Sequence, residues 1–216
     1  MFARIVKILF FGLIIKPVVL IALGLNVVNR NKLPTHEPAI LTPNHNSHLD
    51  TMVLMSLFPL RIIHKVRPVA AADYFLANRI IAWFALHVIG IIPLNRKQVT
   101  RKAQLFEQCH EALKKHEILI FFPEGSRGEP EKMAQLKKGI FHLIRDYKSV
   151  LVYPVMMHGL GRSLPKGEAL FVPFNCDVIV GEPLSCTSHA SELVQEIERQ
   201  FNLMRPLCLT YRADEE

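Results

Sequence analysis

The chain has 216 residues, of which 50% are hydrophobic and 21% charged, and it carries a formal net charge of +7 with a pI near 9.4. This length suffices for one α/β domain with its own core, and the positive charge favours an anionic partner such as membrane lipid, nucleic acid or a phosphorylated substrate. Only 8% of the residues are aromatic and one is Trp, which argues against a stacking platform for nucleic acid.

Residues 1–32 form the most apolar stretch, and we expect them to be a hydrophobic, helical membrane anchor. Their apolar runs, 8–15 and 18–28, are divided by Lys16 and Pro17. The stretch is long enough to span a bilayer, but Pro17 bends a helix and Lys16 is costly at mid-bilayer. A helical hairpin or a tilted segment in one leaflet fits better, with flanking basic residues on the cytoplasmic face of the inner or plasma membrane.

Three other interpretations of this segment stay open: a cleaved signal peptide, a single helix across the bilayer, and a pair of helices buried in the core. The interrupted apolar run argues against the signal peptide. Residues 33–216 contain no internal repeat, low-complexity tract or Gly/Ser-rich linker. We therefore expect them to form one domain after the anchor.

Within residues 33–216, apolar runs of strand length alternate with segments of helical periodicity. The apolar runs cover residues 39–42, 88–94, 118–122 and 150–155. Helical spacing extends over residues 50–58, 99–116, 136–147 and 191–204. In the last of these, Leu193, Ile197 and Phe201 share one face. The alternation predicts an α/β fold, whose functional groups gather at the carboxyl ends of the strands, and polar residues do follow the apolar runs.

The segment LTPNHNSHLD, residues 41–50, contains a candidate catalytic pair, His45 and Asp50. In one continuous helix their side chains would diverge by about 140°, so a pair requires His45 in a turn and Asp50 near a helix start. Pro43 and Asn44 favour the turn, which Asn44 and Ser47 can brace. An Asp on one imidazole nitrogen fixes the tautomer and leaves the other nitrogen as a base. An Asp cap beside surface histidines fits the spacing equally well.

The segment FFPEGSRG, residues 121–128, follows another apolar run and is a candidate anion site. Its glycines permit a tight turn with exposed N–H groups, and Arg127 can bind a phosphate through two hydrogen bonds. An ordinary β-turn with solvated charges is the alternative. Arg96, which ends GIIPLNR, stands just past a strand end and is a second candidate phosphate ligand.

No enzyme nucleophile is evident, because the chain has no GxSxG motif and no motif that pairs a Cys with a base. Walker A and GxGxxG motifs are also missing, which gives nucleotide binding no support. A base without a nucleophile indicates that the substrate supplies the hydroxyl, which attacks an activated acyl carbon directly. The four cysteines are scattered, as in a reducing compartment, and we expect neither a metal site nor a bound cofactor.

Four blocks resemble, in the same order, those of the glycerolipid acyltransferase family, typified by 1-acylglycerol-3-phosphate (lysophosphatidic acid) acyltransferase. NHNSHLD is similar to the family's NHxSxxD block, and GIIPLNR to its block ending in Arg. FFPEGSRG is similar to an FPEGTRS-type block, and VLVYPV to a strand with Pro. Gly128 stands where Ser is usual and Tyr153 where an aliphatic residue is common, and neither change touches the proposed base.

The resemblance implies an O-acyltransferase in which His45 is the general base and Asp50 orients it. The acceptor would be lysophosphatidate and the donor acyl-CoA or acyl carrier protein, with phosphatidate as the product for phospholipid biosynthesis. Five residues would bind the acceptor phosphate: Arg96, Glu124, Gly125, Ser126 and Arg127. Three would line the acyl pocket: Val152, Pro154 and Val155. The implied fold is an α/β core of residues 33–216, a mixed sheet of seven-stranded type flanked by helices, with a membrane-embedded N-terminal helical segment.

The resemblance leaves the acceptor open among lysophosphatidate, glycerol 3-phosphate, another lysophospholipid and a lyso-ornithine lipid. The expected partners are membrane lipid, the acceptor and the acyl donor, and nucleic acid is not expected. A second class of function is a non-catalytic lipid-binding protein that keeps the fold. The intact pair of His45 and Asp50 favours the enzyme, since Gln or Asn at position 45 would indicate the lipid binder.

Overall fold

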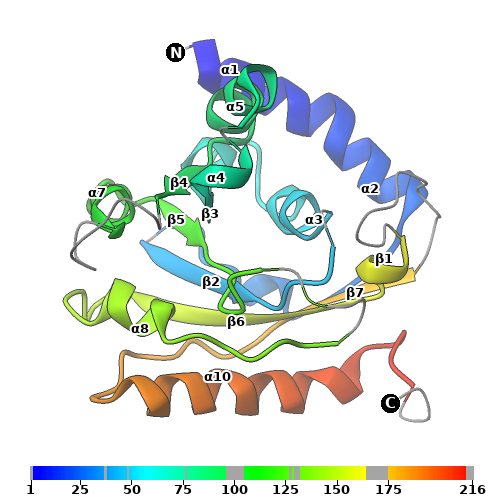
Figure 1. Cartoon of the computed structure of the whole chain (residues 1–216). Coiled ribbons are helices and arrows are strands. Elements are labelled where there is room, and N and C mark those ends of the chain that lie inside the picture. The colour runs from blue at the N-terminus through cyan, green and yellow to red at the C-terminus, as the bar shows by residue number, and fades with distance from the viewer. Residues whose placement is uncertain are drawn as a thin grey trace.

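The computed structural model describes residues 2–36, 38–47, 49–75, 77–95, 105–126, 128, 132–163 and 175–212. In these residues seven strands form one sheet, in the order β1-β7-β6-β2-β5-β3-β4 (Figure 1). The strands are β1 (Gly24–Val28), β2 (Ala39–Pro43), β3 (Val66–Ala71), β4 (Ile92–Leu94), β5 (Ile118–Ile120), β6 (Leu151–His158) and β7 (Asn175–Val180). Neighbouring strands are parallel except β6 and β7, which are antiparallel. The expected α/β class with a mixed sheet is confirmed.

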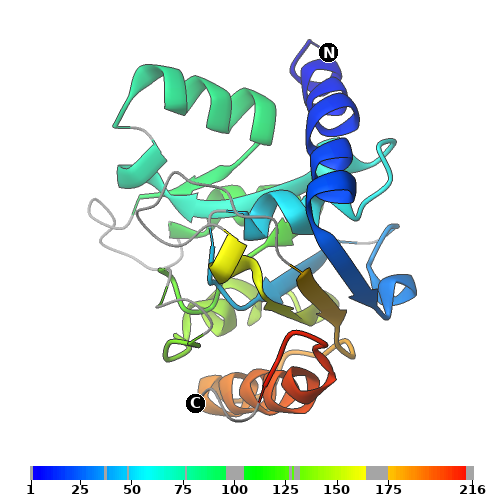
Figure 2. The same cartoon turned by 90° about the vertical axis from the view of Figure 1, so that its right-hand side faces the viewer.

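Helices cover both faces of the sheet (Figures 1 and 2). They are α1 (Phe2–Phe10), α2 (Lys16–Ala22), α3 (Asp50–Ser56), α4 (Ala72–Phe75), α5 (Arg79–Phe84), α7 (Glu107–Lys114), α8 (Gly139–Ile144), α9 (Leu160–Ser163) and α10 (Ala190–Met204). Two π-helical turns (Phe11–Ile15, Ala85–Ile89) and three 3-10 turns (Arg30–Lys32, Ile63–Lys65, Arg205–Leu207) complete the set. Buried side chains of α2 and α3 belong to one hydrophobic cluster, and those of α7, α8 and α10 to a second.

The central strands are mostly apolar because both of their faces are covered. In β2, Ala39 and Leu41 belong to the first cluster and Ile40 to the second. Successive side chains of a strand point to opposite faces, so both faces of a strand between two helical layers favour apolar residues. The buried Thr42 at the end of β2 satisfies its hydroxyl by donating a hydrogen bond to Phe121 O at 3.1 Å. Most of the polar side chains near β2 therefore follow its carboxyl end.

Most predicted elements are confirmed, and one is divided. The runs at residues 39, 118 and 150 form β2, β5 and β6, and α10 buries Leu193, Ile197 and Phe201. The run at 88–94 is half helical, because the second π-helical turn ends at Ile89 and Gly90 follows with a φ of 77°. Glycine in this left-handed conformation commonly ends a helix, and β4 starts only afterwards. Residues 99–104 of the helix expected over 99–116 lie outside the described residues.

Residues 2–22 form one helical run rather than a hairpin (Figures 1 and 2). The first π-helical turn joins α1 to α2, and Pro17 lies in the first turn of α2. Because Pro lacks an N–H group, the widened turn before it lets the helix continue without a break. In the described part of the chain, no helix is both long enough and apolar enough to cross a membrane.

The helical segment ends at Ala22, not at residue 32. β1 begins at Gly24 and pairs with β7 along its whole length, from Gly24 opposite Asn175 to Val28 opposite Ile179. β1 is therefore an edge strand of the sheet, and residues 24–28 are part of the α/β domain. The boundary predicted at residue 32 does not coincide with the end of the helix.

Two lysines of this helical run point into the protein. Lys7 Nζ donates a hydrogen bond to Val66 O at 2.8 Å, and Lys16 Nζ donates one to Phe58 O at 2.9 Å. Burial is the main reason that the pKa of Lys7 falls to about 7. The same run exposes large apolar residues, with Leu20 and Ile21 more than 80% accessible. A helix that faces water buries its apolar side chains and exposes its charged ones, whereas this helical run turns two lysine side chains inward and exposes apolar residues.

We expect Lys7→Met to remove a pH dependence of stability. Between pH 7 and the ordinary lysine pKa of 10.5, the unfolded chain binds a proton at Lys7 that the folded chain has released. The free energy of unfolding of the wild type should therefore rise with pH, by about 2 kcal/mol from pH 7 to 9, relative to the variant. Urea unfolding of both proteins at several pH values measures the difference. Parallel pH profiles would contradict the prediction.

Candidate active site

The two segments predicted to carry chemistry meet at one edge of the sheet. β2 and β5 are parallel neighbours, with Leu41 opposite Ile120, so the residues that follow them leave the sheet side by side. A main-chain hydrogen bond from Gly128 N to His45 O, 3.4 Å long, joins the two segments. The prediction that polar groups gather at the carboxyl ends of the strands is confirmed for these two strands.

His45 and Asp50 form a hydrogen-bonded pair. His45 lies in the turn after β2, Asp50 is the first residue of α3, and Nδ1 of the imidazole is 2.8 Å from Asp50 Oδ2. The same oxygen accepts hydrogen bonds from the main-chain N–H groups of Asn46 (2.8 Å) and Ser47 (2.9 Å). The imidazole stacks on Phe122, with ring centroids 3.9 Å apart. A carboxylate only accepts, so Nδ1 carries the proton and Nε2 is the basic nitrogen.

The loop that holds His45 is tied to β6 through two asparagines. Asn44 Oδ1 accepts from Met157 N at 2.7 Å, and Asn44 Nδ2 donates to Met157 O at 2.8 Å. Asn46 Nδ2 donates to the same oxygen at 3.2 Å. Ser47 Oγ accepts from Leu49 N at 3.2 Å and closes the turn locally. Asn44 and Ser47 thus brace the turn as predicted, whereas nothing in the sequence pattern pointed to Asn46.

Glu124 braces the same loop and does not have the surroundings of a phosphate ligand. Its side chain is buried, Oε1 accepts from His45 N at 2.7 Å, and Oε2 accepts from Ala134 N at 2.9 Å. Burial raises the pKa of this carboxyl, and the two N–H donors offset only part of that rise. An acid with both oxygens occupied offers nothing to an anion, so we reassign Glu124 from acceptor binding to positioning His45.

The other predicted phosphate ligands divide into two groups. Gly125 and Ser126 line a cavity together with His45. Gly125 has a φ of 72°, which a side chain would strain, and its N–H bonds Phe122 O at 3.1 Å in a tight turn. Arg96 and Arg127 lie outside the described residues. The described residues of this segment form a tight turn that also lines the cavity. Both predictions for the segment, a β-turn and an anion site, therefore stay compatible with the structure.

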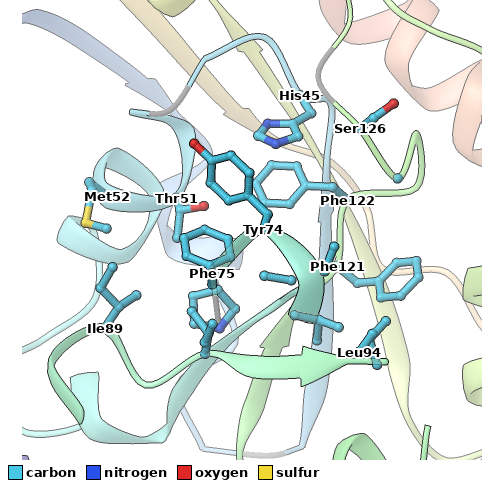
Figure 3. A pocket seen from close by; sticks show the side chains of 16 residues that line it. His45, Thr51, Met52, Tyr74, Phe75, Ile89, Leu94, Phe121, Phe122 and Ser126 are labelled. Carbon is cyan, nitrogen blue, oxygen red and sulfur yellow. The ribbon is translucent and has the colours of Figure 1, made fainter. Parts of the chain in front are cut away.

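The cavity has a volume of about 420 Å³ and a mostly apolar lining. In Figure 3, His45 and Ser126 lie at one end and Ile89 and Leu94 at the other. The lining residues come from the loop after β2, from α3, β3, α4 and β4, and from the segments beside β4 and β5: His45, Thr51, Met52, Pro68, Val69, Ala70, Ala71, Tyr74, Phe75, Ile89, Ile91, Leu94, Phe121, Phe122, Gly125 and Ser126. A basic nitrogen at one end of an apolar cavity suits a reaction at the polar end of a lipid chain.

The three residues predicted to line an acyl pocket lie elsewhere. Val152, Pro154 and Val155 belong to β6, where Val152 and Val155 are fully buried in different hydrophobic clusters. None of the three lines the cavity beside His45. A central strand packed on both faces leaves no room for a chain, so the apolar cavity is the better place for one. Apart from His45 and the segment from Phe121 to Ser126, its lining residues belong to no predicted motif, which is why the sequence did not indicate them.

The structure is thus an α/β domain in which a histidine, hydrogen-bonded to a buried aspartate, lies at the carboxyl ends of the strands and lines an apolar cavity. A family model described as Acyltransferase matches residues 24–158. The chain belongs to this acyltransferase family. The matched region includes the loop of His45 and the turn of Glu124, so the four sequence blocks that resembled the family lie within it.

Named relatives agree with this membership. The chain is 30% identical to the chloroplastic 1-acyl-sn-glycerol-3-phosphate acyltransferase of Arabidopsis thaliana over 74% of this chain and 43% of the relative. It is 32% identical to a Chlamydomonas reinhardtii enzyme of the same name over 77% and 48% of the two chains. The chain thus spans about half the length of the curated relatives it matches.

A solved structure has the same fold. The crystal structure of the 1-acyl-sn-glycerophosphate (LPA) acyltransferase from Thermotoga maritima superposes with a TM-score of 0.74 and covers 93% of this chain and 78% of its own. The two sequences are 21% identical. The mixed sheet and its flanking helices are therefore an architecture that this family uses.

Proposed function

We propose that this protein is a membrane-associated O-acyltransferase that moves an acyl chain from acyl-CoA or acyl carrier protein to the hydroxyl of 1-acylglycerol 3-phosphate. The product is phosphatidate for phospholipid biosynthesis. The observation that carries the proposal is the 2.8 Å hydrogen bond between His45 Nδ1 and Asp50 Oδ2 at one end of the apolar cavity. The names of the relatives support lysophosphatidate as the acceptor.

In the proposed reaction, His45 Nε2 takes the proton of the acceptor hydroxyl as its oxygen attacks the thioester carbonyl carbon. A C–O bond forms, the C–S bond breaks, and the imidazolium returns the proton to the leaving thiolate. Asp50 stabilises the imidazolium and holds the ring in one tautomer. Glu124, Asn44 and Asn46 keep the loop in place, so the base needs little reorganisation when substrate binds.

We further propose that the cavity holds an acyl chain and that the acceptor phosphate lies near the turn of Gly125 and Ser126. The acceptor phosphate then lies at the His45 end of the cavity, and the acyl chain extends toward the end of Ile89 and Leu94. Arg96 and Arg127 follow the strand end and the turn that border this region, and a guanidinium suits a phosphate through two parallel hydrogen bonds. Both arginines stay predicted phosphate ligands.

Ala70→Phe should shorten the acyl chain that the enzyme accepts. Ala70 lines the cavity from β3, and a phenyl ring there would occupy space meant for several methylene groups. Since each buried methylene contributes about 0.8 kcal/mol, kcat/KM for a 16-carbon donor should fall at least about tenfold relative to an 8-carbon donor. Competition between the two donors measures the ratio. An unchanged ratio would place the acyl chain outside this cavity.

Membrane association is proposed from the helical run of residues 2–22. Its inward lysines and outward apolar side chains fit a helix that lies in one leaflet rather than in water. The positive charge of the chain favours the anionic cytoplasmic face. Deletion of residues 1–30 would not test this, because it also removes β1 from the sheet.

The test of the proposed function is acyl transfer from labelled acyl-CoA and acyl carrier protein to a panel of acceptors. The panel contains lysophosphatidate, glycerol 3-phosphate, other lysophospholipids and a lyso-ornithine lipid. Labelled phosphatidate from lysophosphatidate is the expected product. If product forms only from another acceptor, that acceptor replaces lysophosphatidate as the proposed substrate. If the purified protein in lipid vesicles forms no product from any acceptor, the non-catalytic lipid-binding alternative is favoured.

A further inference from the structure

Exposed large apolar side chains gather in three places of the described chain. Eight of the sixteen lie on residues 2–22 and three near the end of α10. The other five form what we name the α5 surface: Tyr74, Ile80, Ile81, Trp83 and Leu86. Ile80 is 79% exposed and Trp83 49%. A water-soluble surface seldom exposes so many large apolar groups together, which points to a binding surface.

The α5 surface adjoins the N-terminal helical run. Phe84 of α5 packs edge-on against Phe10 of α1, with ring centroids 5.2 Å apart. Both views place α1 and α5 at the end of the molecule opposite α10 (Figures 1 and 2). A surface that contacts the exposed residues of α1 can therefore contact those of α5 as well.

Charge and residue type identify the layer as an anionic lipid leaflet. Residues 1–95 carry nine Lys and Arg against three Asp and Glu, which gives +6 of the net charge of +7. Arg4 in α1 and Arg79 at the start of α5 are both exposed. Trp83 and Tyr74 belong to the residue types that concentrate at the boundary between lipid and water. Aliphatic groups that insert, aromatic groups at the boundary and cations around them match a membrane surface better than a protein partner.

The same segment forms a wall of the cavity. Tyr74 and Phe75 of α4 and Ile89 at the end of the π-helical turn all line it, and Tyr74 is also 55% exposed. In Figure 3 the two aromatic rings lie between His45 and the far end of the cavity. One side of this segment thus faces the cavity while the other side is exposed beside the N-terminal helix.

We propose that the α5 surface is a second lipid-contact site, in which Ile80 and Trp83 insert into an anionic leaflet beside residues 2–22. This contact holds the wall of Tyr74 and Phe75 against the bilayer, so that long-chain substrates enter the cavity from the membrane without crossing water. The binding site is independent of the reaction, whereas the entry route rests on the proposed function. The occupant is the leaflet itself, and no particular headgroup is required beyond a negative charge.

The test compares the full-length chain with Ile80→Ser/Trp83→Ser and with a matched control, Leu203→Ser/Leu207→Ser. The control removes two exposed leucines near the end of α10, away from α1 and α5. Sedimentation with vesicles of phosphatidylcholine and phosphatidylglycerol measures partitioning. We expect the α5 variant to partition at least about tenfold more weakly than wild type and the control to match wild type. Equal partitioning of all three proteins would overturn the proposal.

A second measurement separates entry from binding. Transfer to a long-chain acceptor in the same vesicles should fall in the α5 variant, while transfer to a short-chain acceptor dissolved as monomers should not. An equal fall with both acceptors would overturn the entry route. If no protein transfers acyl groups to either acceptor, the proposed function fails and the entry route with it, whereas the vesicle result still decides the second lipid-contact site. Matching thermal unfolding of the three proteins confirms that the exposed substitutions leave the fold intact.

Discussion

His45→Ala should lower the rate of acyl transfer by about 10³-fold or more, because the acceptor hydroxyl then loses its general base. Its side chain is partly accessible and its structural partners are few, so the fold should persist. Asp50 Oδ2 keeps its two main-chain donors in the variant, and the loop keeps its contacts with Met157 and Glu124. Initial rates with labelled donor and lysophosphatidate in vesicles give the ratio.

His189→Ala is the matched control for this experiment. His189 is exposed, directly precedes α10 and does not line the cavity. Its side chain provides no cap for that helix. The control should retain the rate of the wild type. Unchanged turnover in His45→Ala would remove the proposed base and leave the site as one that binds lipid without acting on it.

Asp50→Asn should lower kcat by about 10³-fold and also lower the free energy of unfolding. An amide oxygen at the position of Oδ2 can still accept the three hydrogen bonds, but a neutral amide does not stabilise the imidazolium. The amide nitrogen would replace Oδ1, which is buried and has no hydrogen-bond partner among the described residues. A buried donor without a partner costs about 1–3 kcal/mol. Rates and urea unfolding of the same preparations separate the two effects.

Asp146→Asn controls for the loss of a carboxylate. Asp146 is exposed and pairs only with the neighbouring Arg145, at 3.4 Å, among the contacts of the described residues. It should match the wild type in rate and stability. If Asp50→Asn lowered stability by several kcal/mol but kept its rate when folded, Asp50 would be a structural helix-start residue and not the partner of the base.

The alternation of elements was predictable because it depends on local periodicity. A strand covered on both faces is mostly apolar, and a helix covered on one face repeats its apolar residues every three or four positions, so β2, β5, β6 and α10 could be recognised directly. The run that ends at β4 was misjudged because apolar residues of a buried helical turn and of a strand look alike. In the structure, the left-handed Gly90 marks the point where the helical turn ends and the chain leads into β4.

The hydrogen-bonded pair of His45 and Asp50 was predictable for a similar reason, since the two residues are close in sequence and their geometry is set by one turn. The role of Glu124 was not. A carboxylate after a strand looks the same whether it faces an anion or main-chain N–H groups. Its partner His45 is 79 residues away, and only the parallel pairing of β2 and β5 brings the two together.

Local sequence patterns were enough to predict the α/β class, the pairing of His45 with Asp50, and the apolar, basic character of the first part of the chain. The fold was needed to show which apolar residues form a cavity, which carboxylate braces the loop, and which way the N-terminal lysines point. The reason is the distance along the chain between the residues that interact. Periodicity, turns and charge are properties of neighbours along the chain, whereas a cavity, a brace or an exposed face depends on which distant segments the sheet places side by side.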